Sequence, residues 1–237
     1  MHTKNLDNIG IVKFKKSNFA KNISISVRPI HGVKVSFPYY ISYSDAEQIV
    51  NQKRDWILRQ LNKAKEVEKR RTIFNENGSY QTRFHTLALF KHEKNIFSVR
   101  VQNGMIKVYY PSCADINSEN VQSAIRTGIE RALRKEANEY LPDRAKELAE
   151  KFGFEYKKLA LKNIRTRWGS CSKRKNINLN IHLMRLPDQL IDYVILHELA
   201  HTVEMNHSKN FWKLLDKLTG GAKQLNKELK KHHISFY

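Results

Sequence analysis

Residues 196–207 read LHELAHTVEMNH, and no other stretch of the sequence gathers so many histidines. Three of the ten histidines of the protein fall within it, together with Glu198. The residues that lead into it, YVIL from Tyr193, are apolar, which predicts a helix that is largely buried. Because burying an unpaired polar group costs several kcal/mol, histidines on such a helix need partners. The stretch therefore predicts a metal site.

The spacing H-E-x-x-H fixes the geometry of the first two ligands. His197 and His201 are four residues apart, so on a helix their rings lie on one face, one turn apart. Glu198 lies about 100° around the helix from His197, where its carboxylate reaches a water rather than the metal. Zinc lowers the pKa of its bound water to about 7, and a nearby carboxylate can then act as the general base. The pattern predicts a catalytic zinc site with Glu198 as the base.

The third protein ligand has two candidates, since a catalytic zinc ion takes three protein ligands and keeps its fourth position open. Glu204 lies seven residues after His197 and shares its face if the helix continues. His207 follows Asn206, a residue that tolerates the left-handed conformation in which helices end, so the chain can fold back to the ion. We favour His207 because histidine is the commonest metal ligand, and Glu204 then contacts the ligands or the solvent.

The first half of the chain is predicted to be rich in strands. Residues 44–70 have a helical period, with Ser44 and Glu47 in a capping box. Asn103-Gly104 predicts a hairpin turn. Apolar and polar residues alternate in the remaining segments, which are 9–15, 22–28, 33–37, 84–90, 96–101 and 105–110. We expect an N-terminal β-rich domain over residues 1–115, with one long helix.

The second half, residues 116–237, is predicted to be mainly helical. A helical pattern covers residues 119–152, with an interruption expected at Pro142 and an end at Gly153. A small sheet is expected from strands at 158–166 and 176–183, and the helix that carries the histidines from about 188 to 205. The predicted fold class is α+β, with a strand-rich N-terminal half and a helix-rich C-terminal half.

Composition limits the partners and the location. The net charge of +20, from 43 basic and 23 acidic residues, favours anionic partners such as a nucleotide or a nucleic acid. Two cysteines, Cys113 and Cys171, do not make a disulfide framework and favour a reducing compartment. No stretch approaches the roughly 20 apolar residues of a membrane span, and no signal-peptide pattern occurs at the start. We expect a soluble, cytoplasmic protein without a membrane partner.

A second motif, RTRWGSCS, begins at Arg165. On a strand, Arg165 and Arg167 face the same side, where their guanidinium groups can clamp a carboxylate or a phosphate. The alternative is a solvated strand with Trp168 packed in the core. Gly169 allows a close backbone approach or a bulge. Cys171 is either a metal ligand or nucleophile, or a small buried residue; we favour the last, because the histidines already make a sufficient site.

These motifs occur in order in the run IRTRWGSCSKRKNINLNIHLMRLPDQLIDYVILHELAHTVEMNHSKNFW, residues 164–212. This run resembles the YgjP-like metallopeptidase family, minimal zincins related to the WLM and SprT-like groups. The segment SNFAKNISISVRPIHGVKVSFP, residues 17–38, resembles the N-terminal strands of the same family. The resemblance implies a zincin-like C-terminal half that binds one Zn²⁺ ion, and it implies that the ligands are His197, His201 and His207.

The resemblance also implies that Glu198 is catalytic and that residues Arg167–Ser170 lie beside the site. Where the family has an aromatic-basic pair, this chain has Ile181-His182, so the role of His182 is open. The residues expected to bind substrate or to contact the ligands are Arg165, Arg167, Trp168, Gly169, Ser170, Asn180 and Glu204.

The function that this chemistry predicts is a zinc-dependent hydrolase acting on a peptide or protein substrate. In zincins an extended substrate commonly adds to the edge of a small sheet, and we expect the strand at 176–183 to supply that edge. One alternative is a metal-dependent nucleoside triphosphate pyrophosphohydrolase in which Arg165 and Arg167 bind phosphates, although no phosphate-binding glycine loop occurs. Another is a nucleic-acid-associated protease, by analogy with SprT-like proteins.

Overall fold

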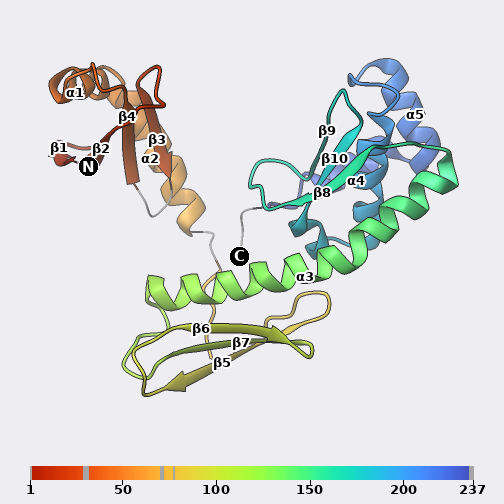
Figure 1. Ribbon diagram of the computed structural model, residues 1–237, viewed down its shortest axis with the longest axis horizontal. Coiled ribbons are helices and arrows are strands. Elements are labelled where there is room, and N and C mark those ends of the chain that lie inside the picture. Colours follow the sequence, from red (N-terminus) through yellow and green to blue (C-terminus); the bar gives the residue numbers. More distant parts are fainter. Residues whose placement is uncertain (1, 29–31, 70–71, 77, 235–237) are drawn as a thin grey trace. The chain divides into compact units, whose positions relative to one another are not determined.

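The computed structural model divides into two compact units, Met1–Thr72 and Ile73–Tyr237 (Figure 1). Within these units the structure describes residues 2–28, 32–69, 72–76 and 78–234. Residues 29–31 of the segment that resembles the family's N-terminal strands, and residue 70 of the predicted helix, lie outside the described residues. Across the described ranges, no helix has the length and apolar character needed to cross a membrane. The α+β fold class is confirmed.

The first unit is a four-stranded sheet with two helices. The strand order is β1-β2-β4-β3, in which β2 and β4 are parallel and the outer pairs are antiparallel. The elements are β1 His2–Leu6, β2 Gly10–Lys16, β3 Ser24–Arg28, β4 Gly32–Phe37, α1 Tyr43–Gln52 and α2 Arg54–Lys69. Alternation along β2 and β4 places one set of side chains in the core, where they meet residues of the helices: Val12, Phe14, Val33, Val35, Phe37, Val50 and Ile57.

The predicted helix at 44–70 is two helices, and its predicted capping box is wrong. Helix α1 begins after Ser42, whose hydroxyl accepts a hydrogen bond from the backbone N–H of Asp45 at 3.1 Å, while the Asp45 carboxylate accepts one from the Ser42 N–H at 3.3 Å. The same serine-to-acid spacing therefore occurs two residues earlier than expected. Glu47 instead pairs with Lys4 across the unit at 2.7 Å.

The second unit holds two three-stranded sheets and the remaining helices. One sheet has the order β5-β7-β6, and the other has the order β8-β10-β9. The strands are β5 Thr86–His92, β6 Ser98–Gln102, β7 Met105–Pro111, β8 Lys158–Lys162, β9 Gly169–Cys171 and β10 Asn176–Asn180. The helices are α3 Glu119–Phe152, the 3₁₀ helix η1 Ile181–Arg185, α4 Asp188–Ala200, α5 Lys209–Thr219 and α6 Ala222–Leu229. The predicted hairpin turn between β6 and β7 is confirmed, since Asn103 and Gly104 both have positive φ.

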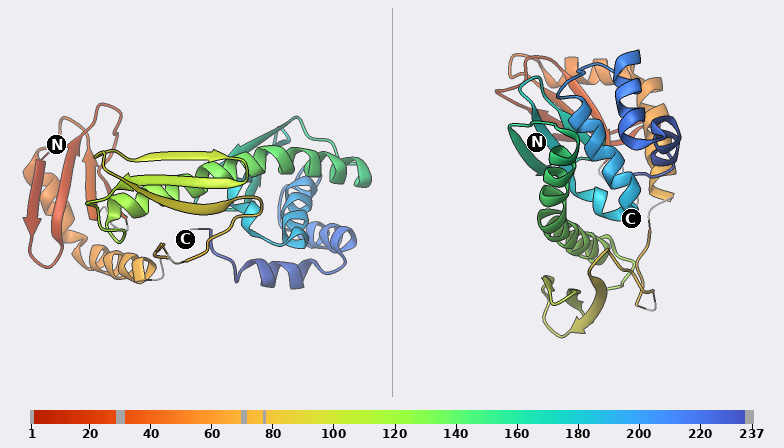
Figure 2. Two further views of the ribbon diagram at one scale, coloured as in Figure 1. Left: turned by 90° about the horizontal axis from the view of Figure 1, so that it is seen from below. Right: turned by 90° about the vertical axis from the view of Figure 1, so that its right-hand side faces the viewer.

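Helix α3 joins the two sheets of the second unit. Its first half lies on the β5–β7 sheet so closely that a Cβ at Gly128 would come within 2.8 Å of Ile106. Its second half packs against η1 and α4, and Figures 1 and 2 show the single helix passing from one sheet to the other. The boundary between units therefore falls between residues 72 and 73, whereas the predicted boundary at 115 lies inside the second unit. The reason is that the β5–β7 sheet buries its apolar face against α3.

The interruption predicted at Pro142 does not occur. Helix α3 continues through Pro142 and ends at Gly153, which adopts the left-handed conformation with φ 70°. Proline removes one backbone donor, but the neighbouring Leu141 and Ala145 are buried in the core, and this packing stabilises the helix on both sides.

Helix α4 is fixed to α3 by a bidentate ion pair. The guanidinium of Arg144 donates to both carboxylate oxygens of Asp192, with distances of 2.7 and 2.5 Å. Arg83, ahead of β5, donates to Asp188 in the first turn of α4 and to the Leu186 carbonyl. Contacts that use two N–H groups of one guanidinium fix the orientation of α4 as well as its distance from the arginine.

The Arg144 pair is expected to stabilise α4 measurably. Arg144→Leu leaves the half-buried Asp192 without its main partner, so the free energy that protects α4 amides from hydrogen exchange should fall by about 1–2 kcal/mol. The matched control is Lys146→Leu on the same helix, because Lys146 is exposed and lies 3.9 Å from Glu150. That change should cost less than about 0.5 kcal/mol. Equal losses in the two variants would contradict the prediction.

Candidate metal centre

Helix α4 carries His197, Glu198 and His201 at its C-terminal end. The helix is buried on most of its surface, as its apolar sequence predicted. It ends earlier than expected, with His201 as the C-cap, and the turn that follows is closed by hydrogen bonds from the N–H groups of Val203 and Glu204 to the Ala200 carbonyl. Asn206 does not take the left-handed conformation proposed for it. The turn thus begins at His201 and does not depend on Asn206.

The turn brings His207 back to the two histidines of α4. The Nε2 atoms of His207 and His197 are 3.0 Å apart, and one ring nitrogen from each of the three histidines lies within 4.8 Å of the others. Among the described residues this is the one group of three or more His, Cys, Asp or Glu side chains arranged to hold a metal ion. Glu204, the alternative third ligand, is not part of the group.

Glu204 contributes its backbone instead. The Nδ1 atom of His201 lies 3.0 Å from the Glu204 carbonyl oxygen. A carbonyl can only accept, so Nδ1 carries the proton and Nε2 keeps its lone pair. A backbone acceptor that fixes the tautomer of a histidine is the usual arrangement behind a metal ligand.

The protonation states fit a metal ion. Burial, followed by the nearby His201 and His207, lowers the pKa of His197 to about 3, and burial also lowers the pKa of His201. Both rings are therefore neutral near pH 7, as metal binding requires. The Nε2 atoms of His197 and His207 face each other across 3.0 Å, and three imidazole nitrogens match the protein ligand set of a catalytic zinc ion. His207 is exposed, so the site opens to solvent.

Glu198 follows His197 on α4, and its side chain is buried. Its side chain is 5% exposed, its Oε2 atom is buried, and no hydrogen bond reaches it from the described residues. Burial raises the pKa of this carboxyl to about 8, although the Arg167 guanidinium opposes the shift. Burial thus favours the protonated form of this carboxyl, and a neighbouring cation would favour the ionised form that accepts a proton.

Gly169 forms the wall against Glu198. A Cβ at this position would lie 2.5 Å from Glu198 Oε1 and 2.7 Å from its Cγ, so only glycine leaves room for the carboxylate. The close backbone approach expected at Gly169 is therefore present, and its neighbour is the residue expected to be catalytic. Strand β9 holds Gly169 in place by pairing with β10.

Phe211 forms the floor under the three histidines, a role that the sequence analysis missed. Its ring is fully buried and stacks on His201 at 4.5 Å between centroids, while His197 and His207 meet it edge-on at 4.9 and 4.8 Å. The signal was present in the sequence, since Phe211 lies four residues after His207, one turn into α5. Its N–H donates to the hydroxyl of Ser208, which caps that helix.

Asn180 and His182 organise the loop before β9 and are buried. The Asn180 side chain donates to the backbone carbonyls of Ile164 and Arg167 and accepts from the His182 N–H. The His182 ring lies 3.0 Å from the side-chain oxygen of Asn163, and burial lowers its pKa to about 4. Both residues hold the loop that carries the arginines rather than facing solvent.

The remaining candidates divide between the loop and the strand. Arg165 and Arg167 are exposed, while Trp168 is half-buried and packs against the core. Ser170 accepts a hydrogen bond from Asn178 on β10 at 3.1 Å. Cys171 is half-buried, and burial, together with the charge of Glu198, raises the pKa of its thiol, which does not favour a nucleophile.

The expectation that residues 176–183 supply an open sheet edge is wrong. Strand β10 is the central strand of its sheet and ends at Asn180, where η1 begins. The edge next to α4 belongs to β9. Trp168 and Ser172 direct backbone groups toward β10, so by the alternation of an antiparallel pair the backbone groups of Gly169 and Cys171 point away from it.

Residues 21–232 match the family model of the YgjP-like metallopeptidase domain. Among solved structures, the chain is similar to the metallopeptidase zymogen abylysin of Pyrococcus abyssi, with 22% identity and a TM-score of 0.35 over 38% of this chain and 91% of the other. It is also similar to the zymogen jannalysin of Methanocaldococcus jannaschii, with 23% identity and a TM-score of 0.34 over 38% and 93%. No curated protein matches.

The contact between Gly169 and Glu198 predicts that a substitution at Gly169 lowers the turnover number without loss of the metal. Gly169→Ala should displace the Glu198 carboxylate and lower kcat by about 100-fold, because a shift of about 1 Å at a catalytic group has an effect of that size. Metal content and melting temperature should remain close to those of the wild type. Loss of the metal in this variant, or unchanged kcat, would count against the assignment of Glu198.

Phe211 is expected to control metal affinity. Phe211→Leu keeps an apolar side chain but removes the ring contacts with the histidines, so the dissociation constant for zinc should rise about tenfold or more, measured by competition with an indicator. Leu215→Val is the matched control, because Leu215 is also fully buried, one turn further along α5, without ring contacts to the site. If both variants lose affinity equally, the effect is general packing rather than the floor.

Proposed function

Because this chain belongs to the YgjP-like metallopeptidase family, we propose that it is a zinc-dependent peptidase whose metal ligands are His197, His201 and His207. Membership of the family makes the chain a metallopeptidase that acts on peptide or protein substrates. The finer assignments, which are zinc as the metal and Glu198 as the base, are our proposal. The observation that carries it is the convergence of three imidazoles, the first of which is followed on α4 by a buried carboxyl without a hydrogen-bond partner.

Glu198 performs the proton transfers of the proposed reaction. A zinc ion held by the three histidines would act as a Lewis acid on the scissile carbonyl and would acidify the attacking water. A Glu198 oxygen accepts the proton of that water as it attacks the carbonyl carbon. The same oxygen then donates the proton to the leaving nitrogen. The raised pKa supports the second step, since the carboxyl has to hold the proton until the leaving nitrogen takes it; the first step uses the ionised form, which a neighbouring cation would favour.

Strand β9 is the proposed binding edge for the substrate backbone. The outward backbone groups of Gly169 and Cys171 can pair with an extended peptide, which is a common mode of peptide recognition. Gly169 then has two roles. Its lack of a side chain leaves room for Glu198, and its backbone N–H and C=O groups face the peptide. Arg165 and Arg167 lie on the exposed loop just ahead of this edge and can contact the same peptide.

The two alternatives rest on charge. A nucleoside triphosphate, or a nucleic acid bound near the site, would use the net charge of +20 and the two exposed arginines. Neither alternative explains the burial of Glu198 without a hydrogen-bond partner better than peptide hydrolysis does. Both are included as arms of the experiment below.

The decisive experiment combines metal analysis with Glu198→Gln. The variant should retain one equivalent of zinc by elemental analysis and lose about 10²–10⁴-fold in hydrolysis of a peptide library, because general-base catalysis has that magnitude. Removal of the metal with a chelator should abolish wild-type hydrolysis, and added zinc should restore it. A nucleotide panel and a DNA-binding titration at low salt run in parallel.

Two results would contradict the proposal. Full activity of Glu198→Gln on peptides would exclude this residue as the base. Hydrolysis of nucleoside triphosphates, with no peptide of the library cleaved by the zinc-loaded wild type, would favour the pyrophosphohydrolase alternative.

A further inference from the structure

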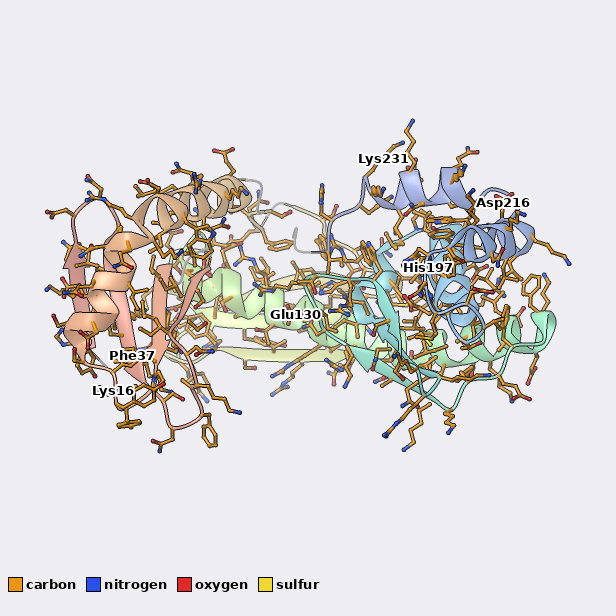
Figure 3. All side chains as sticks on the ribbon, turned by 90° about the horizontal axis from the view of Figure 1, so that it is seen from above. Lys16, Phe37, Glu130, His197, Asp216 and Lys231 are labelled. Atoms are coloured by element: carbon orange, nitrogen blue, oxygen red, sulfur yellow. The ribbon has the colours of Figure 1, made fainter. Side chains whose placement is uncertain are left out.

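A cavity beside the metal centre has a strongly positive lining. Its volume is about 520 Å³, and its wall on the side of the metal centre is His207. One face of α5 supplies Lys209, Trp212, Lys213 and Asp216, and the start of α6 supplies Ala222 and Lys223. Figure 3 shows Asp216 on α5 in the same part of the molecule as His197. The cavity is therefore built from the same helix that carries the floor of the metal centre.

The three ammonium groups of this cavity are available to a ligand. Lys209, Lys213 and Lys223 are exposed, and no carboxylate among the described residues lies within ion-pair distance of them. The one acid of the lining, Asp216, accepts a hydrogen bond from the Ala222 N–H at 3.0 Å and so fixes the start of α6. The lining carries three positive charges against one negative charge.

The apolar part of the lining suits an aliphatic stem. The Trp212 ring is half-buried and lies 6.1 Å from the His207 ring, tilted by 34°, while Ala222 is buried. A ligand that joins a short apolar stem to an anionic head would place the stem against Trp212 and the head among the lysines. The carboxylate of a peptide has this chemistry, either on a glutamate or aspartate side chain or at a free C-terminus.

We propose that this lysine pocket is a specificity subsite that recognises a carboxylate of the peptide substrate next to the bond that is cut. The inference rests on the proposed peptidase function, because it takes the His207 wall as the link between the pocket and the reacting centre. The proposed subsite explains why three lysines line one cavity without forming ion pairs with acidic side chains. The phosphates of a nucleotide would meet the same three lysines. The binding test below therefore includes ATP, which shows whether the pocket prefers a phosphate or a peptide carboxylate.

The test compares peptides that differ only in charge. Zinc-loaded wild type is given peptide pairs with glutamate or glutamine at each position around the cut, in amidated and free-acid forms. At one position the peptide with glutamate should have a kcat/KM about tenfold higher than the peptide with glutamine. The reason is that charge-assisted hydrogen bonds between the lysines and the carboxylate improve binding by a factor of about this size. If instead the free acid is preferred over the amide, the C-terminus is the carboxylate that the pocket binds.

The variants separate the pocket from the overall charge. Changing Lys209, Lys213 and Lys223 together to glutamine should abolish the glutamate preference, so that the glutamate and glutamine peptides are cleaved with equal kcat/KM. The control changes three exposed lysines outside the lining, Lys135, Lys157 and Lys227, to glutamine, which alters the net charge equally and should keep the preference. Lys213→Glu should favour a lysine peptide at the same position.

A binding measurement keeps this proposal separate from the proposed function. The fluorescein-labelled glutamate peptide is titrated against Glu198→Gln by anisotropy, with ATP as a competitor. Binding that depends on the three pocket lysines supports the subsite even if the wild type cleaves no peptide, in which case only the proposed function fails. The subsite is overturned if no carboxylate preference occurs, if the control variant loses it equally, or if ATP binds through these lysines while acidic peptides do not.

Discussion

The metal centre requires three imidazole nitrogens to face one another with no protein group between them. The packing of the second unit holds the three rings in this arrangement. The Nε2 atoms of His197 and His207 are 3.0 Å apart, a distance that suits either one shared proton or two ligand atoms of one cation. The chain therefore has to hold the rings in place by other means. It does so with a buried helix for two of them, a short turn for the third, and the Phe211 ring in contact with all three.

Each of these supports comes from a different element, so the site depends on the whole unit. Arg144 of α3 fixes the direction of α4, and the backbone carbonyl of Glu204 fixes the tautomer of His201. Asn180 at the end of β10 ties down the loop that leads into β9, which in turn places Gly169 against Glu198. The long helix α3 is shared by the β5–β7 sheet and by α4, and for that reason the sheet belongs to the same unit as the metal centre.

Local sequence patterns predicted the parts of the site that follow from helical spacing. The four-residue interval placed His197 and His201 together, and the alternation of β2 and β4 predicted the first core. Patterns of this kind do not show which distant residues meet. The contact of Gly169 with Glu198 spans 29 positions, as their numbers show, and depends on the packing of β9 on α4. The continuation of α3 through Pro142 also depends on packing, because local propensity predicts an interruption that buried neighbours override.

Two buried glutamates show how the fold separates structural from chemical groups. Glu136 on α3 is fully buried, and one of its oxygens accepts hydrogen bonds from Thr82, from the Phe84 N–H and from His85, so it fixes the chain ahead of β5. Glu198 is almost as buried, yet no described group donates to it. A carboxylate without donors destabilises the folded protein, and it is also a stronger base than a solvated one. Burial of Glu198 among groups that do not donate to it therefore raises its proton affinity at a cost in stability, which is the balance expected where a fold serves chemistry.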